Sequence, residues 1–105
     1  MNGIKLIAAE RKRQIEEEGW TEQHDDQHKD GELALAAACY ALPEDERFYP
    51  DEDRPDGKVP VIFPFEGSYW KPGPSRIREL VKAGALIAAE IDRLRREAGM
   101  REGGT

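Results

Sequence analysis

The sequence is poor in several features that assign proteins to common classes. It contains a single cysteine, Cys39, which excludes an intramolecular disulfide framework and a cysteine-based zinc cluster. No apolar run approaches the ~20 residues that a membrane-spanning helix needs. The first residues also lack the basic and apolar regions of a signal peptide. We therefore expect a cytoplasmic protein with no membrane attachment.

Apolar residues are scarce as well. Only 38% of the 105 residues are hydrophobic, 36% are charged, and ten glycines and seven prolines interrupt the rest. The length fits one domain, but a small domain buries only about 60% of the surface that its unfolded chain exposes. We expect a thin core, and hence a homo-oligomer. The formal net charge of -6 argues against DNA or RNA as a partner, because such binding depends on Lys and Arg at the phosphates.

Helical patterns in the first half of the chain predict an all-α fold. An apolar stripe along residues 3–18 is formed by Ile4, Ile7, Ala8 and Ile15, and Gly19 is suited to end this helix. The connection over residues 20–30 is polar and is expected to lie outside the core. Asp30 can cap a second, alanine-rich helix from Gly31 to Leu42, which Pro43 ends. We expect this helix to be buried, because alanine lets another helix approach closely.

A third helix is predicted over residues 75–98, with Ser75 as its N-cap. Its broad apolar face would consist of Ile77, Leu80, Val81, Ile87, Ile91 and Leu94. Between the second and third helices lies a long Pro-rich loop, residues 43–74, which Ile62, Phe63 and Phe65 would pin onto the helices. The predicted architecture is a compact three-helix domain over residues 1–98 with a flexible tail over residues 99–105.

The densest group of chemically active side chains follows the first helix. It consists of Trp20, His24, Asp25, Asp26, His28 and Glu32. Imidazole and carboxylate groups suit a transition metal, and histidine also serves as an acid or base near neutral pH. The spacing matches no named zinc motif, so we name no metal ligand, although a metal held by His24 and His28 with Asp25 or Asp26 stays open. Contact with a ligand and a solvated loop whose Asp residues cap turns both remain open.

Aromatic and basic residues gather around the start of the last helix. Trp70, beside Tyr69, offers a surface on which a planar base can stack, and Trp20 offers another; each can also cover the edge of the core. Lys71, Arg76 and Arg78 follow Trp70, and arginine pairs with phosphate in two-point geometry. The basic residues can equally form a solvated helix face. The combination suits a nucleotide. No nucleophile–base pair is evident, and we predict no catalytic residue.

A longer pattern resembles the repeat domain first described in ryanodine receptors and found in bacteria and phages. Its matching positions are Gly19 and Trp20, Asp25 and Asp26, then Tyr40, Leu42, Pro43 and Glu44, with Gly84 in the last helix. The similarity spans residues 10–49 and 76–87. It implies a ligand-binding module of phage type that takes nucleotide-like molecules.

A weaker similarity connects the chain to nucleotide pyrophosphohydrolases of the MazG type. Those all-α enzymes carry Glu-x-x-Glu on one helix and Glu-x-x-Asp on a later one, to hold magnesium against a triphosphate. The corresponding carboxylates here would be Glu17, Glu32, Glu90 and Asp92, contributed across a dimer. Glu90 and Asp92 are two positions apart and point in different directions on a helix, so the signature is incomplete.

These observations predict a phage-type protein that binds, and sequesters, a nucleotide or a nucleotide-derived immune signal without turnover. The ring would stack on Trp20, Tyr40 or Trp70, and the phosphates would bind Lys71, Arg76 and Arg78. No cofactor is expected. The first alternative is a magnesium-dependent pyrophosphohydrolase, for which magnesium would be the cofactor. The second is an acidic protein–protein inhibitor of a host factor.

Overall fold

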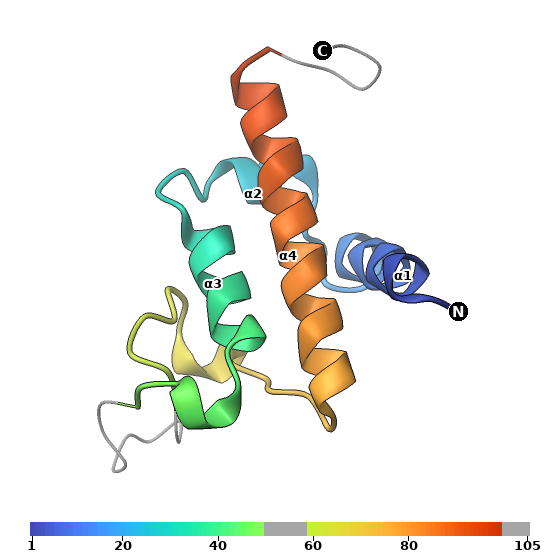
Figure 1. Cartoon of the computed structure of the whole chain (residues 1–105). Helices are drawn as coiled ribbons and strands as arrows, with labels where there is room; N and C mark the ends of the chain where they lie inside the picture. The colour runs from blue at the N-terminus through green and yellow to red at the C-terminus, as the bar shows by residue number, and fades with distance from the viewer. Residues whose placement is uncertain (50–58, 100–105) are drawn as a thin grey trace.

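The computed structural model describes residues 1–49 and 59–99, and this part of the chain is helical without any strand (Figure 1). It contains four α-helices: α1 (Gly3–Glu16), α2 (Glu22–Asp26), α3 (Glu32–Ala41) and α4 (Arg76–Glu97). Two short 3-10 turns, η1 (Glu44–Glu46) and η2 (Gly67–Tyr69), lie in the connection between α3 and α4. None of the described helices has the length and apolar character needed to cross a membrane.

The all-α prediction is confirmed, but the three-helix arrangement is wrong because a fourth α-helix forms in the connection after α1. Thr21 starts α2, since its side chain accepts a hydrogen bond from the backbone N–H of His24. The predicted polar connection therefore contains a helix, and Asp25 within it is completely buried. The proposed Pro-rich loop and the flexible tail fall partly outside the described residues.

Helix α4 is the centre of the fold and contacts α1, α2 and α3. Figure 1 shows α3 alongside α4, with α1 on the other side and viewed almost along its axis. Ser75 caps α4 as predicted, because its side chain accepts from the backbone N–H of Arg78. At the start of α3 the N-cap is Gly31 in the left-handed region and not Asp30. Helix α1 ends at Glu16, two residues earlier than predicted.

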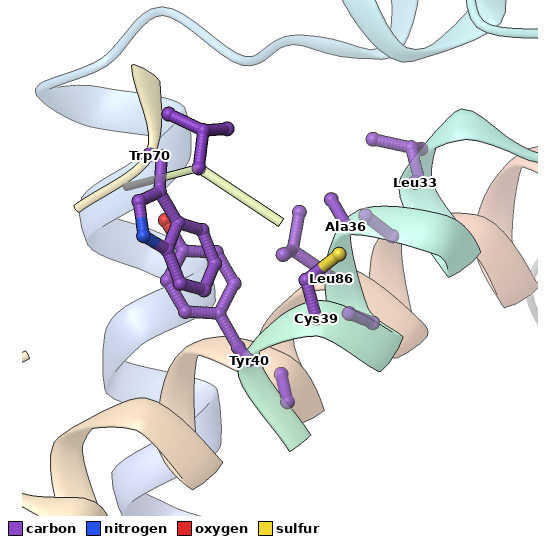
Figure 2. Close-up of a cluster of buried hydrophobic side chains, with 10 residues drawn as sticks. Leu33, Ala36, Cys39, Tyr40, Trp70 and Leu86 are labelled. Atoms are coloured by element: carbon purple, nitrogen blue, oxygen red, sulfur yellow. The ribbon is translucent and has the colours of Figure 1, made fainter. Parts of the chain in front are cut away.

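Small residues let α3 and α4 pack closely. Ala36 and Ala37 of α3 meet Ala83 and Ala89 of α4 in one buried cluster, as the alanine pattern predicted. Figure 2 shows the larger members of that cluster, Leu33, Cys39, Tyr40, Trp70 and Leu86. Cys39 is fully buried in this cluster and packs as a small apolar side chain. Phe63 and Phe65 pack against the cluster as expected, whereas Ile62 is exposed.

The apolar faces predicted for the first and last helices are largely wrong. Helix α1 buries the polar residues Glu10 and Gln14 and leaves Ile4 and Ile15 exposed. Of the six residues predicted to line the inner face of α4, only Val81 is buried. The reason is that the alanines of α4, not its large aliphatic residues, allow the neighbouring helices to approach. The large residues consequently face outward.

Candidate functional site

A cavity of about 370 Å³ opens between α3, the end of α1 and the connection that precedes α4. Its walls are mainly aromatic and aliphatic, and its lining residues are Glu18, Trp20, His24, His28, Leu33, Ala36, Tyr40, Phe63, Phe65, Tyr69 and Leu86. The volume lies at the lower end of the ~300–1,000 Å³ that is typical of small-molecule pockets. A flat, largely apolar ring is the ligand that suits such walls.

The aromatic rings around the cavity contact one another in sequence. Trp20 stacks on His24 with an angle of 2° between the rings, and the His24 and His28 centroids lie 5.0 Å apart. The ring of His28 meets the edge of Phe65 at 5.0 Å, and Phe65 in turn lies 5.8 Å from Phe63. Each ring is thus held by its neighbours, so the wall is pre-organised for stacking.

Tyr40 also lines the cavity, and its ring and its hydroxyl are both held by neighbouring residues. Figure 2 shows its ring stacked on that of Trp70, and the two ring centroids lie 4.6 Å apart. The guanidinium carbon of Arg47 lies 5.1 Å from the centroid of the Trp70 ring. The Tyr40 hydroxyl accepts a hydrogen bond from the backbone N–H of Lys71 at 3.0 Å. Burial raises the pKa of Tyr40, so its hydroxyl is neutral near pH 7.

A smaller hollow of about 50 Å³ adjoins the aromatic cavity and shares Glu18, Trp20, Tyr40 and Tyr69 with it. The residues that belong to the smaller hollow alone are Glu10, Arg13, Gln14, Lys71 and Lys82. Three of these five carry a positive charge and one a negative charge. With the shared Glu18, the smaller hollow has three cationic and two acidic side chains, and Arg13 pairs with both acids. Lys71 and Lys82 leave it with a net positive charge, and we refer to it as the cationic hollow.

Lys82 lines the cationic hollow next to Tyr40, which both chambers share. Its ammonium group donates to the backbone oxygen of Lys71 at 2.6 Å and lies 5.5 Å from the centre of the Tyr40 ring. Burial lowers the pKa of Lys82, and the nearby charge of Arg78 lowers it further. An anion bound beside this ammonium would relieve both effects, so the position favours a negatively charged ligand group.

Beneath the cationic hollow, Glu10 is buried and neutralised by arginines. Arg13 donates two hydrogen bonds to its carboxylate at 2.8 and 3.0 Å, and Arg78 of α4 donates a third. Burial raises the pKa of Glu10, but these hydrogen bonds lower it by more, so the carboxyl is ionised. Glu10 thus fixes the guanidinium of Arg13 at the edge of the hollow.

Gln14, which lines the same hollow, carries a buried acceptor atom without a donor. Its side chain is 2% exposed, and its Nε2 donates to Glu10 at 3.3 Å, which sets the orientation of the amide. The amide oxygen, Oε1, receives no hydrogen bond from any residue that the structure describes. A buried acceptor without a donor costs about 1–3 kcal/mol. A ligand hydroxyl or amino group in the hollow would supply the missing donor.

Six of the ten residues proposed from the sequence to bind ligand gather here or immediately behind the wall. Trp20, His24, His28 and Tyr40 line the aromatic cavity, Lys71 lines the cationic hollow, and Trp70 supports Tyr40 from the core.

The other four make structural contacts. Asp25 is fully buried and bound to Arg11, and Asp26 forms an ion pair with Arg96 of α4. Arg76 donates to the backbone oxygens of Tyr40, Ala41 and Leu42 and so caps the C-terminus of α3; Arg78 pairs with Glu10.

The sequence interpretation missed several residues of the site. It did not propose Arg13, Gln14 and Glu18, because the apolar stripe of the first helix was expected to face the core and its polar residues to face solvent. Tyr69 was noted beside Trp70 but not proposed as a ligand contact, and Lys82 was not proposed as one either. The sequence could have indicated Lys82, because it lies one helical turn after Arg78 and hence on the same face of the helix.

The carboxylates considered for a magnesium site do not form a cluster. Glu90 accepts from Arg93 at 2.6 Å, and Glu32 accepts from the backbone of Asp30 and lies 3.6 Å from His28. Within residues 1–49 and 59–99, no three His, Cys, Asp or Glu side chains are placed to hold a metal ion together.

Comparisons of the chain with protein-family models, with curated proteins and with solved structures give no match. The site is therefore interpreted from its own geometry.

Proposed function

We propose that this protein binds a nucleotide or a nucleotide-derived molecule, with the base in the aromatic cavity and an anionic group in the cationic hollow. The observation that carries the proposal is the junction of the two chambers at Trp20, Tyr40 and Tyr69. A ligand that spans them needs a flat ring at one end and negative charge at the other. Nucleotides have both features within one small molecule.

The unpaired acceptor of Gln14 and the two lysines of the cationic hollow indicate which part of a nucleotide would lie there. Gln14 Oε1 lacks a donor, and the ammonium groups of Lys71 and Lys82 attract an anion, whereas Arg13 is already paired with Glu10 and Glu18. A sugar hydroxyl next to a phosphate satisfies both requirements at neighbouring positions. We therefore assign the base to the aromatic cavity, and the sugar hydroxyl and phosphate to the cationic hollow.

Binding without turnover is the form of the proposal that the side chains support. The described residues hold no cluster of carboxylates for magnesium, and the polar groups nearest the hollow are neutralised by one another. Sequestration of a nucleotide signal would need only tight binding. A pyrophosphohydrolase would need Glu17, Glu32, Glu90 and Asp92 to act together, and no contact among them supports that alternative.

The test is a mixture of nucleotides and cyclic nucleotides incubated with the protein and magnesium, then filtered and analysed by mass spectrometry. A species that disappears from the filtrate and returns intact when the retained protein is heated supports the proposal. A species that reappears as a monophosphate with pyrophosphate contradicts binding without turnover. A filtrate that keeps every species unchanged overturns nucleotide binding.

Variants then locate the retained species by calorimetry. Trp20→Ala should raise its Kd by about 10-fold or more, since stacking on an aromatic side chain contributes about 1–3 kcal/mol per base. Lys82→Met should weaken phosphate-bearing ligands and leave the corresponding nucleoside unaffected. Phe48→Ala and Lys12→Met, on exposed positions outside both chambers, are the matched controls. Unchanged affinity in folded Trp20→Ala would rule out the aromatic cavity.

A further inference from the structure

Both histidines of the chain line the aromatic cavity, and each has one ring nitrogen beside a carboxylate. His24 Nδ1 lies 3.0 Å from an oxygen of Asp25, and His28 Nδ1 lies 3.6 Å from an oxygen of Glu32. An ionised carboxylate only accepts hydrogen bonds, and Arg11 holds that of Asp25 in an ion pair. In the neutral ring of His24 the proton is therefore on Nδ1, and Nε2 carries a lone pair.

Glu32 favours the same tautomer in His28. Burial raises the pKa of Glu32, but backbone hydrogen bonds and the nearby His28 lower it by more, so the carboxyl is ionised. At 3.6 Å its charge attracts the ring electrostatically and favours the form in which the proton is on Nδ1. Within residues 1–49 and 59–99, the Nε2 atoms of His24 and His28 have no hydrogen-bond partner. The two rings thus bring two unpaired acceptors to the cavity.

The wall around the two histidines is mostly carbon. Trp20 stacks on His24, Phe65 meets His28 at 5.0 Å, and Leu33 lies in the same lining. The side chains of His24 and His28 remain 35% and 21% exposed, so a ligand can reach them. A polar group of a bound base that faces these rings must pair with the imidazoles or lose its hydrogen bonds to water. The two histidines therefore control which base is bound.

We propose that His24 and His28 select bases that carry an exocyclic amino group, a specificity that rests on the nucleotide binding proposed above. An amino group has two N–H bonds and can donate to two acceptors about 5 Å apart at ordinary hydrogen-bond lengths. The centroids of the two rings are 5.0 Å apart, which allows one amino group to reach both. A carbonyl oxygen in its place would face two lone pairs. Adenine, guanine and cytosine carry an amino group, whereas uracil and hypoxanthine do not.

Nucleotides that differ only in the amino group test this selectivity by calorimetry. Adenosine is compared with purine riboside, guanosine with inosine, and cytidine with its analogue lacking the 4-amino group, each as the 5′-monophosphate. We expect the amino-bearing member of at least one pair to bind about 10-fold or more tightly, since it gains two hydrogen bonds. Equal Kd values within every pair that binds would overturn the selectivity and leave the proposed function in place. If none of the six binds, the selectivity is overturned, and the nucleotide mixture described above decides the proposed function separately.

Variants of the histidines test the assignment to these two rings. His24→Phe and His28→Phe keep a ring in the wall and remove the acceptor atom. Each should reduce the preference for the amino group to about threefold or less, because one of the two hydrogen bonds remains. Lys82→Met, which removes a charge from the cationic hollow, should weaken both members of a pair equally and preserve the preference. A preference that persists unchanged in both phenylalanine variants would overturn the role of the histidines.

The tautomers can be measured without any ligand. Nitrogen-15 NMR of the two rings in mildly alkaline buffer distinguishes a protonated from an unprotonated ring nitrogen. We expect protonated Nδ1 and unprotonated Nε2 in both His24 and His28. A protonated Nε2 in either ring would remove one of the two acceptors and overturn the proposal. This result does not depend on nucleotide binding, so it separates a failure of the selectivity from a failure of the proposed function.

Discussion

Asp25 offers the sharpest test of whether a residue proposed for ligand contact is instead structural. Its carboxylate accepts from Arg11 Nη2 at 2.6 Å and contacts His24 Nδ1 at 3.0 Å, and the side chain is 0% exposed. Nε and Nη1 of Arg11 are buried and have no partner among the described residues. Asp25 is therefore the only ionic partner that the described structure gives to Arg11, and it joins α2 to α1.

The substitution Asp25→Asn keeps the shape of the side chain and removes its charge. Loss of one partner of a buried ion pair costs about 3–5 kcal/mol, because the other charge is left uncompensated. The Arg11 side chain is 13% exposed and the Asn side chain retains one acceptor oxygen, so we expect the lower end, about 3 kcal/mol. Arg11→Met in addition should restore about 2 kcal/mol, because the unpaired cation is then gone.

The neighbouring residue provides a matched control. Asp26 pairs with Arg96 at 2.8 Å, but its side chain is 49% exposed, so Asp26→Asn should cost at most about 1 kcal/mol. Urea unfolding of the three variants and the unaltered protein, followed by circular dichroism, measures the difference. Equal losses for Asp25→Asn and Asp26→Asn, or no recovery with Arg11→Met, would refute the reasoning. If Asp25→Asn changes the ligand affinity but not the free energy of unfolding, Asp25 contacts the ligand and is not mainly structural.

Two further predictions concern the groups that support the cavities. Arg47→Met should lower the free energy of unfolding by about 3 kcal/mol, since it removes the donor to the Cys39 backbone oxygen and the partner of Glu79; a urea titration that shows no loss would contradict this. Glu10 has a lowered pKa in the folded state, so its contribution to stability is complete above the unfolded pKa of about 4.3 and disappears as the pH falls through the folded value. Glu10→Gln should therefore flatten the decline of unfolding free energy below about pH 5, and an unchanged decline would show that other carboxyls cause it.

The sequence determined the helical class, the burial of the alanine-rich helix and the cap at Ser75. These features depend on neighbours along the chain, namely the spacing of apolar residues, a hydroxyl before a helix and a proline after one. It also singled out Trp20, the two histidines and Tyr40, which the structure places around one cavity. Each of those inferences needed only local information.

The tertiary structure decided which face of each helix is buried. The aliphatic stripes of α1 and α4 predicted an inward orientation, but close packing of alanines turned the large residues of α4 outward and buried Glu10 and Gln14. The same packing kept Arg76 and Arg78 out of the lining of both cavities and placed Arg13 and Lys82 in the lining of the smaller one. The physical reason is that a buried charge is stable only beside its partner. Arg78 and Glu10 are 68 residues apart, so that pairing exists only after the chain has folded.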